Sequence, residues 1–340
     1  MQENISGFLL KYGYQGPLSH RIRKVWNPSW FQGRVEKKDY FEGWYLKAVS
    51  ADGRHSWAFI PGLSLNRDDN HSFVQAIDGK TGKTWYFRYP KEDFRFSPGD
   101  FSIAVGPNLF SQKGMVVDLE NHAGFFRGRL EFGDFTRYPV SFRRPGIMGW
   151  YRYVPFMECY HGVVSLDHSV DGEILHSEGL IHLDHGRGYI EKDWGTSMPE
   201  AWIWMQTNHF EQAGTSFMLS VAKIPWIGKS FTGFLGFFHH RGKLHSFATY
   251  TGAKIQHISD KGKLLHLEIK HAKFRIEIEA LRGEKGSLKA PVSGNMERII
   301  HESIDASIRV TLIDKKNRVL FAEQGIHAGL ETVGNLSMLS

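Results

Sequence analysis

The stretches LLHLEIK (residues 264–270) and FRIEIEA (residues 274–280) alternate apolar and polar residues and are separated by only three residues. A period of two is typical of a β-strand with one buried face, and a short polar link between two such runs is typical of an antiparallel hairpin. The same alternation occurs at residues 159–166, 173–183 and 307–313. No amphipathic helical run exceeds about three turns. We therefore predict an all-β protein with few short helices.

The composition of the 340-residue chain strengthens this prediction. Aromatic residues reach 14%, with 25 Phe, 12 Tyr and 10 Trp, and there are 36 Gly. Many aromatic rings combined with many turn-forming glycines favour β-structure around large apolar cavities. Asp-Gly dipeptides at residues 52–53, 78–79 and 171–172 are typical of tight turns and predict chain reversals there.

The stretch FRRPGIMGWYRYVP (residues 142–155) contains two prolines and two glycines and interrupts the alternation. It predicts a boundary between an N-terminal domain, residues 1–145, and a C-terminal domain, residues 146–340. A weak internal similarity joins residues 42–64 and 200–225, which both run from a Trp-containing strand through a polar turn into an apolar strand. Two similar β-units, each a barrel or a strongly curved sheet, would explain this similarity.

Other sequence features exclude several classes of protein. The most apolar run, around Phe231–Phe238, is far shorter than the ~20 residues of a membrane-spanning helix. Residues 1–16 lack the basic region of a signal peptide. Cys159 is the single cysteine, so an internal disulfide or a cysteine-based zinc cluster cannot form, and a small buried side chain is favoured over a catalytic thiol. These features favour the cytoplasm.

The net charge of +6 comes from scattered basic residues, without the basic stripe or the motif of a nucleic-acid-binding protein. A mildly basic, aromatic-rich protein is also compatible with peripheral contact with an anionic membrane. The sequence has no P-loop, dinucleotide fingerprint or G-x-S-x-G nucleophile motif. His182, Asp184 and His185 lack a third histidine at convincing spacing, so we predict neither a metal site nor a cofactor.

Three aromatic and polar clusters remain: YFEGWY (residues 40–45), GYIEKDWG (residues 188–195) and WIWMQTN (residues 202–208). In the third cluster, alternation places two indoles and two amides on one face: Trp202, Trp204, Gln206 and Asn208. Such a face suits a flat ligand with an apolar body and a few oxygen atoms. It also suits an aromatic core whose amides bond to the backbone.

In the second cluster, alternation places Glu191 and Asp193 on one face of a strand. Two like charges on a buried face repel, which favours keeping one carboxyl neutral, as a general acid requires. Surface ion pairs with Lys192 and nearby arginines are the alternative. Glu42 in the first cluster is either a buried acceptor for backbone donors or a residue of the site.

These clusters give the sequence a resemblance to a known family. The FEGWY motif, the GYIEKDWG-x-S-x-P motif and the W-x-W-x-Q-x-N motif that follows resemble the tocopherol cyclase family, in order from about Trp26 to about Leu330. A late stretch, His327–Gly334, is of the kind found near the end of these proteins. The resemblance implies a lipocalin-like β architecture in two halves, related to the carotenoid hydratase-like group. It also implies an enzyme that cyclises a prenylated hydroquinone to a chromanol.

This implied reaction gives roles to the singled-out residues. Protonating a trisubstituted alkene requires a well-placed acid, for which Asp193 is the first choice and Glu191 the second. Glu42 would orient that acid or accept the phenol proton, and His161 would assist as a base. Aromatic rings would stabilise the cation and amides would hold the quinol oxygens, the rings being Trp44, Tyr45, Trp194, Trp202 and Trp204 and the amides Gln206 and Asn208.

Three other functions stay open at this point. A hydratase or related lyase acting on an isoprenoid would use the same acid but admit water. A carrier of lipids or quinones would need the apolar cavity and no acid. A protein whose aromatic clusters are only core would need neither.

Overall fold

The computed structural model describes the chain except for residues 1–8, 12–16, 34–38, 156, 227 and 340. The segment 1–16, for which we predict no signal peptide, therefore lies largely outside the described residues. The chain divides into two compact units. The first comprises residues 1–77, 84–198 and 289–298, and the second comprises residues 78–83, 199–288 and 299–340.

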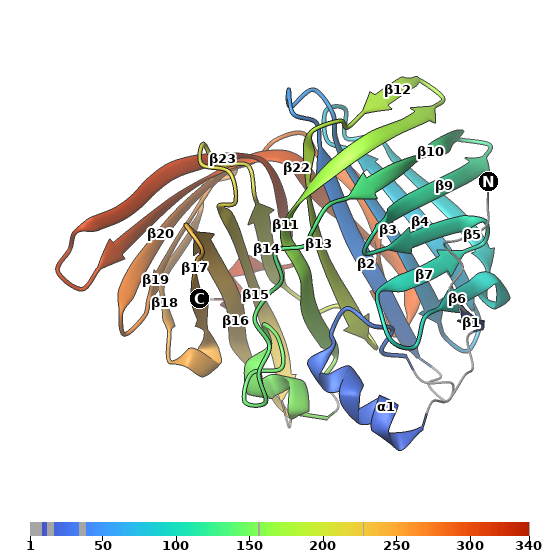
Figure 1. The fold of residues 1–340 in the computed structure, drawn as a ribbon. Helices are drawn as coiled ribbons and strands as arrows, with labels where there is room; N and C mark the ends of the chain where they lie inside the picture. The colour runs from blue at the N-terminus through green and yellow to red at the C-terminus, as the bar shows by residue number, and fades with distance from the viewer. Residues whose placement is uncertain (1–8, 12–16, 34–38, 156, 227, 340) are drawn as a thin grey trace. The chain divides into compact units, whose positions relative to one another are not determined.

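Thirteen strands form the antiparallel sheet of the first unit (Figure 1). Their bounds are β1 Leu10–Lys11, β2 Tyr40–Val49, β3 Ser56–Leu65, β4 His71–Asp78, β5 Thr84–Pro90, β6 Phe94–Phe96, β7 Ser102–Val105, β8 Asn108–Ser111, β9 Gly114–Asn121, β10 Gly124–Phe132, β11 Cys159–His176, β12 Gly179–His182 and β13 Gly186–Gly195. The order is β1-β6-β7-β8-β9-β10-β11-β13-β2-β3-β4-β5, and β12 pairs with β11. The sequence-distant strands β11, β13 and β2 therefore lie side by side.

Ten strands form a second sheet, most of which lies in the second unit. Their bounds are β14 Trp202–Thr207, β15 Ser216–Trp226, β16 Lys229–His240, β17 Lys243–Ala248, β18 Lys254–Asp260, β19 Leu264–Lys270, β20 Phe274–Leu281, β21 Gly286–Val292, β22 Asn295–Asp314 and β23 Val319–Val333. The order is β17-β16-β15-β14-β23-β22-β20-β19-β18, and β21 pairs with β22. The predicted hairpin is confirmed, because β19 and β20 pair antiparallel.

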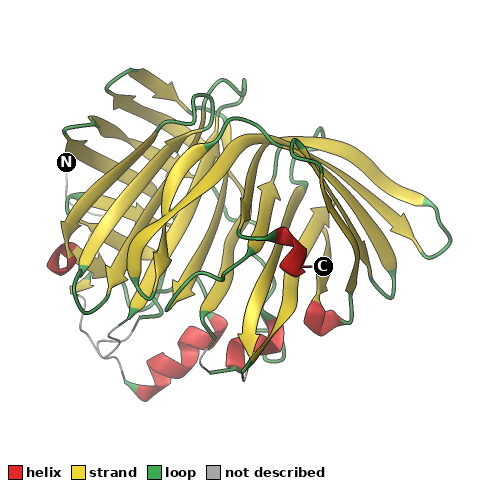
Figure 2. Cartoon of the chain, turned by 180° about the vertical axis from the view of Figure 1, so that it is seen from behind, coloured by secondary structure: helices red, strands yellow, loops and turns green. Residues whose placement is uncertain are grey.

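Helices are few and short, as predicted (Figure 2). They are α1 Leu18–Arg23 and the 3-10 helices η1 Lys24–Trp26, η2 Lys91–Asp93, η3 Gly149–Tyr153, η4 Thr249–Thr251 and η5 Leu336–Leu339. Among the described residues, no helix has both the length and the apolar character needed to cross a membrane.

The first sheet curves strongly around an apolar core. Trp85 in β5 donates to the carbonyl of Ala123 at 3.1 Å, and Asn121 donates to the carbonyl of Tyr86 at 3.0 Å. These contacts join β5 to the hairpin of β9 and β10, which is remote from it in the strand order. The enclosed core is rich in aromatic rings, including Trp44 and Phe126 among others.

The second sheet is curved in the same way. The ring of Phe247 on β17 lies 6.5 Å from that of Phe274 on β20, although these two strands are six steps apart in the sheet order. The core between them contains Ile203 and Met205 from β14. The all-β prediction is thus confirmed, with curved sheets: the pairings described for each sheet run between two end strands and do not close into a barrel.

Two predictions about chain organisation differ from the structure. The division at residue 145/146 does not coincide with the compact units, because β11 and β13 lie after it in sequence and yet complete the first sheet. The turn predicted at residues 171–172 is wrong, because β11 runs through it. Gly172 adopts a φ of 123° there, and a Cβ would lie 2.4 Å from the carbonyl oxygen of Arg129, so glycine permits the close approach of β10.

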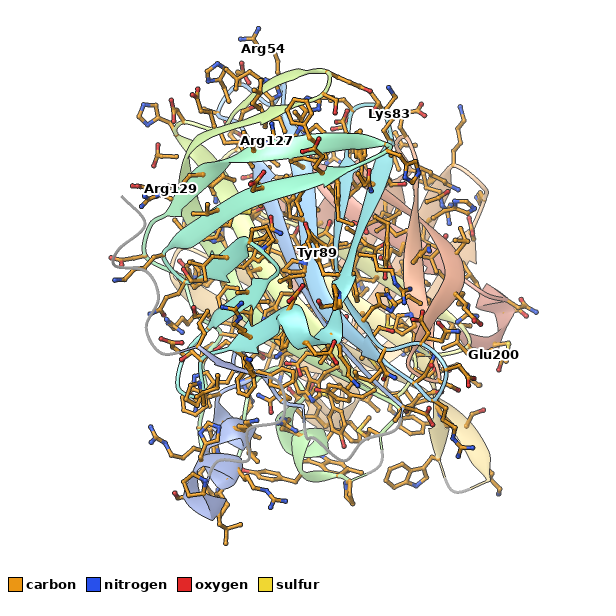
Figure 3. The ribbon with its side chains drawn as sticks, turned by 90° about the vertical axis from the view of Figure 1, so that its right-hand side faces the viewer. Arg54, Lys83, Tyr89, Arg127, Arg129 and Glu200 are labelled. Carbon is orange, nitrogen blue, oxygen red and sulfur yellow. The ribbon has the colours of Figure 1, made fainter. Side chains whose placement is uncertain are left out.

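Several basic side chains of the first sheet are paired with carboxylates. Arg54 in the turn after β2 pairs with Asp52, and Arg127 and Arg129 on β10 pair with neighbouring carboxylates (Figure 3). This part of the surface therefore carries exposed, solvated charges of both signs.

Candidate active site

The candidate site lies at the centre of the first sheet, where β13 runs between β11 and β2. His161 on β11 lies directly across from Asp193, and Tyr45 on β2 lies directly across from Glu191. Directly opposed residues of an antiparallel pair point to the same face of the sheet. These four side chains therefore share one face, the face opposite the apolar core.

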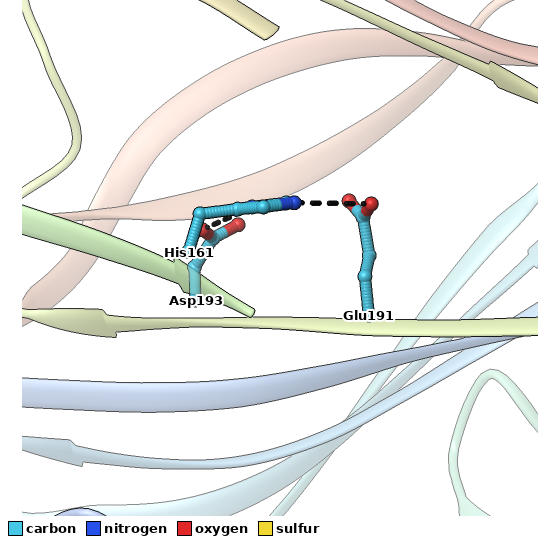
Figure 4. A group of neighbouring side chains, drawn as sticks. All are labelled: His161, Glu191 and Asp193. Carbon is cyan, nitrogen blue, oxygen red and sulfur yellow. Dashed lines mark hydrogen bonds and ion pairs between the residues drawn. The ribbon is translucent and has the colours of Figure 1, made fainter. Parts of the chain in front are cut away.

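On this face, the imidazole of His161 lies between two carboxylates (Figure 4). Its Nδ1 is 2.8 Å from Oδ1 of Asp193, and its Nε2 is 3.3 Å from Oε2 of Glu191. The Tyr189 hydroxyl donates to that same oxygen of Glu191 at 2.6 Å. Each ring nitrogen thus faces a different carboxyl group, and the imidazole connects the two.

The charge of this group follows from its surroundings. Burial alone would lower the pKa of His161, but the negative charges of Glu191 and Asp193 outweigh burial and raise that pKa to about 10. Burial, reinforced by the Glu191 charge, raises the pKa of Tyr189 well above its ordinary value. At neutral pH the group is therefore an imidazolium between two acidic groups, with a tyrosine that stays protonated and donates.

The two carboxyl groups differ in their accessibility. The side chain of Asp193 is 30% exposed, whereas that of Glu191 is 4% exposed. Oδ1 of Asp193 is taken by His161, while the described residues provide no hydrogen-bond donor to its Oδ2. Asp193 is therefore the acidic group that a ligand can reach, and Oδ2 is its available oxygen.

Cys159 lies beside this group without the character of a nucleophile. Its Sγ is 3.8 Å from Oδ1 of Asp193 and 3.8 Å from the sulfur of Met198. Burial, with the charges of Asp193 and Glu158, raises the pKa of the thiol well above its ordinary value. A reactive cysteine needs a lowered pKa, so the structure agrees with an inert small side chain.

The opposite face of β13 holds a second buried ionic group, centred on Glu42. Its carboxylate accepts hydrogen bonds from the backbone N–H groups of Gln32 and Gly33 at 2.9 and 3.1 Å. It also accepts from the Tyr40 hydroxyl and pairs with Lys192. Four donors around one carboxylate satisfy most of its acceptor capacity, so this is the buried acceptor of the two alternatives.

Lys192 completes this group inside the aromatic core. Its ammonium also donates to the carbonyl of Trp30 at 2.7 Å and lies 4.2 Å from the ring centre of Trp44 and 5.0 Å from that of Trp194. Burial lowers its pKa to about 8, although the Glu42 charge acts in the opposite direction. The cation is thus held by one carboxylate, one carbonyl and two indole faces.

In the second unit, β14 and the residue that follows it, Asn208, present the predicted face of indoles and amides. Trp202, Trp204, Gln206 and Asn208 are all buried, and Ile203 and Met205 point the other way into the apolar core. Trp202 donates through Nε1 to Oε2 of Glu331 at 2.7 Å. This face is therefore buried and yet carries two amide side chains, which are mostly exposed in folded proteins.

Comparison with known proteins identifies the family. A model described as tocopherol cyclase-like matches residues 131–334, which include both β11 and β13. The chain belongs to the tocopherol cyclase-like family. The predicted resemblance is thereby confirmed.

Curated tocopherol cyclase-like relatives cover most of the chain. A probable chloroplastic tocopherol cyclase of Oryza sativa subsp. japonica is 24% identical, over 82% of this chain and 71% of its own length. A chloroplastic tocopherol cyclase of Zea mays is 26% identical, over 82% of this chain and 70% of its own. A crystal structure of CghA has the same fold, with a TM-score of 0.57 and 10% identity over 87% of this chain and 89% of that one.

The structure separates the predicted tocopherol cyclase-like site residues into groups. His161, Glu191, Asp193 and Tyr45 share one face of the first sheet. Glu42, Trp44 and Trp194 lie on its other face, so they cannot orient Asp193 directly or line its side of the sheet. Trp44 and Trp194 instead contact the ammonium of Lys192. The residues of β14 belong to the second unit.

Sequence reasoning missed three residues of this region. Tyr189 shares the parity of Glu191 and Asp193 along β13, so alternation alone could have placed it on their face. Met148 contacts the backbone N–H of His161 through its sulfur at 3.1 Å, and Arg152 lies 5.0 Å from the ring centre of Trp194. No local pattern points to these last two contacts, because they join the irregular segment around η3 to strands β11 and β13.

His161, Glu191 and Asp193 could also supply one metal-ligand atom each, since these atoms lie within 4.8 Å of one another. A metal requires a neutral imidazole with a free lone pair. Here both ring nitrogens face carboxylates whose charges raise the pKa of the ring, so a metal would have to displace a proton from it. The arrangement therefore fits proton transfer better than metal binding. His182 and His185, considered in the sequence, lie beside different carboxylates.

Proposed function

We propose that the chain closes a chromanol ring on a prenylated hydroquinone, starting with protonation of the prenyl double bond. The observation that carries the proposal is the buried imidazolium of His161 between Asp193 and Glu191. The family supports the reaction type, and the names of the plant relatives support the substrate class. The cytoplasm is the proposed compartment.

The proposed reaction balances without a consumed cofactor. A carboxyl proton adds to the less substituted alkene carbon, which breaks the π bond and leaves a tertiary cation. The ring oxygen then forms a C–O bond to that cation and releases its proton to a base. Substrate and product have the same composition, so the proposed class is an intramolecular lyase or isomerase. The enzyme donates one proton to the alkene and accepts one from the ring oxygen.

The geometry favours Asp193 as the acid. Its Oδ2 is the accessible oxygen, and Oδ1 accepts a hydrogen bond from the imidazolium of His161. A cation bonded to one oxygen of a carboxyl group favours departure of a proton from the other. In the proposed cycle, Asp193 delivers a proton from Oδ2, and the imidazolium of His161 supplies the proton that replaces it.

Glu191 takes the role of base that the sequence analysis gave to Glu42, with His161 assisting; the raised pKa of His161 instead makes it the group that relays the proton. It faces Nε2 of His161, whereas Asp193 faces Nδ1. A proton accepted at Glu191 can therefore return to Asp193 through the imidazole, which restores the acid for the next cycle. Tyr189 holds the receiving oxygen in place. Tyr45 provides an aromatic ring on the same face, where a cation would gain ~0.5–2 kcal/mol.

The β14 face of the second unit stays a prediction on its own. Trp202 and Trp204 supply apolar ring surface, and Gln206 and Asn208 supply amides for ligand oxygens. Changing each amide to leucine and measuring the dissociation constant of a quinol analogue tests this prediction separately from catalysis.

The proposal is tested by incubating purified protein with geranyl hydroquinone in D2O and analysing the product by mass spectrometry. We expect a ring-closed product with one carbon-bound deuterium. Asp193→Asn should abolish it, and Asp118→Asn, at an exposed carboxylate on β9, should not. Incorporation of oxygen from labelled water would identify a hydratase instead. Saturable binding without turnover would identify a carrier, and full activity of Asp193→Asn would refute the assigned acid.

A further inference from the structure

An exposed apolar face occurs on α1 of the first unit. Leu18 and Ile22 are 69% and 50% exposed, and their spacing of four places them on the same side of the helix. None of the residues of α1 is buried. His20 and Arg23 pack against the ring of Trp30, whereas Leu18 and Ile22 remain exposed, so the apolar side of the helix contributes little unless it meets something else.

The segment 140–153 continues this exposed face. Phe142 is 77% exposed, Trp150 49% and Tyr153 45%. Trp26, at the end of η1, connects the segment to α1: its ring centre lies 5.8 Å from that of Phe142 and 6.2 Å from that of Tyr153. Leu18, Ile22, Phe142, Trp150 and Tyr153 are referred to below as the α1–η3 surface.

The two segments that carry the α1–η3 surface contain charged residues of one sign. Residues 17–33 and 140–155 contain no Asp or Glu. They contain six Lys and Arg residues, of which four are exposed: Arg21, Arg23, Arg143 and Arg144. This contrasts with β10, where Arg127 and Arg129 pair with carboxylates. A second copy of the chain would present the same positive charge, so self-association through this surface is disfavoured.

We propose that the α1–η3 surface docks on the surface of an anionic lipid bilayer. Exposed Trp, Tyr, Phe and Leu side chains insert at the boundary between headgroups and acyl chains, and arginines beside them contact anionic headgroups. The α1–η3 surface thus combines exposed apolar side chains with arginines for which the described residues show no carboxylate partner. On β10, by contrast, the arginines are paired with carboxylates.

The same segment also reaches the candidate site. On its inner side, Met148 contacts the backbone N–H of His161 at 3.1 Å. The guanidinium of Arg152 lies 5.4 Å from the ring centre of Tyr160 and 5.0 Å from that of Trp194, on the two strands that carry His161 and Asp193. A lipid contact at Trp150 is therefore only a few residues from the site. Membrane docking does not depend on the proposed function. The further idea that docking lets a substrate pass from the bilayer into the site does rest on the proposed function.

Flotation with vesicles of phosphatidylcholine, with and without phosphatidylglycerol, tests the docking directly. We expect the full chain to float only with phosphatidylglycerol. Arg143→Gln/Arg144→Gln should reduce the partition coefficient by about 25-fold, at about five-fold for each arginine. Phe142→Ser/Trp150→Ser should remove the binding that persists at high salt. Arg67→Gln/Arg95→Gln and Leu175→Ser/Leu180→Ser are matched exposed controls in the same unit and should bind normally.

Binding that ignores phosphatidylglycerol, or that falls equally in the control variants, would overturn the proposal. An unchanged far-ultraviolet circular dichroism spectrum would show that the surface variants are folded. Turnover separates this proposal from the proposed function. Surface variants should process a short-chain substrate in solution normally and a vesicle-embedded one slowly. If the wild-type chain floats but turns over neither substrate, docking holds and the proposed function fails; if it turns over both without floating, docking fails.

Discussion

Removing either partner of the buried Glu42–Lys192 pair should destabilise the first unit, and the two changes should differ in size. Glu42 accepts from Gln32, Gly33, Tyr40 and Lys192, whereas the Lys192 ammonium has Glu42 and the carbonyl of Trp30 as its acceptors. The two side chains are fully buried. The pair is therefore asymmetric, with four donors on one side and two acceptors on the other.

The magnitudes follow from this count. Glu42→Gln leaves a buried ammonium without its counter-charge and turns an amide NH2 toward other donors. It should therefore lower the free energy of unfolding by about 3–5 kcal/mol. Lys192→Met removes the cation together with its desolvation penalty and leaves three donors on Glu42. It should cost about 1.5–3 kcal/mol, the value of one hydrogen bond to a charged group. Methionine also retains a flexible apolar stem between Trp44 and Trp194.

Equilibrium urea unfolding followed by tryptophan emission measures both effects. Glu120→Gln, which removes one exposed pair with Arg127, serves as the control and should cost about 1 kcal/mol or less. In the double variant Glu42→Gln/Lys192→Met, the loss should be smaller than the sum of the single losses, because no isolated charge remains. The reasoning is refuted if Lys192→Met costs more than Glu42→Gln, or if both cost no more than the control.

Three further outcomes test the group around His161. Its pKa is about 10 in the folded protein against an ordinary 6.5, so its stabilisation is complete below pH 6.5 and is lost as the pH rises to about 10. The stability gap between wild type and His161→Gln should therefore narrow over that range, by at most about 1.4 kcal/mol per pH unit, and a constant gap in urea unfolding would contradict this. Tyr189→Phe removes the hydrogen bond to Glu191 and should cost about 1–2 kcal/mol, checked by the same method. Cys159 should react slowly with a thiol reagent at pH 8 until the protein is unfolded, and rapid native labelling would show that its pKa is not raised.

The fold was largely predictable because its main signal is local. Alternation at residues 264–270 and 274–280 is a property of each strand, and the strands pair as predicted. The division of the chain was not predictable in this way. β11 pairs with β10 but also with β13, and β13 pairs with β2 across more than a hundred residues, a contact that no local pattern encodes.

The site shows the same limit at the level of single residues. Alternation placed Glu191 and Asp193 on one face, and the register of β13 with β11 and β2 agrees with this. Trp194 follows Asp193 directly, so the same alternation places its ring on the opposite face of the sheet. The sequence prediction nevertheless gave this ring a role in the same site as Asp193. The partnership of His161 with both carboxylates depends on the register between β11 and β13, which is set by long-range pairing.

The run Glu191-Lys192-Asp193 explains why the two ionic groups belong together. Consecutive residues of a strand point to opposite faces, so this run sends two carboxylates to one face of a central strand and an ammonium to the other. Each charge would be costly to bury alone. On one side β11 supplies the cation of His161, and on the other β2 supplies the anion of Glu42. We therefore expect Glu42 and Lys192 to act on the proposed chemistry as positioning residues, by fixing the strand from which Glu191 and Asp193 reach His161.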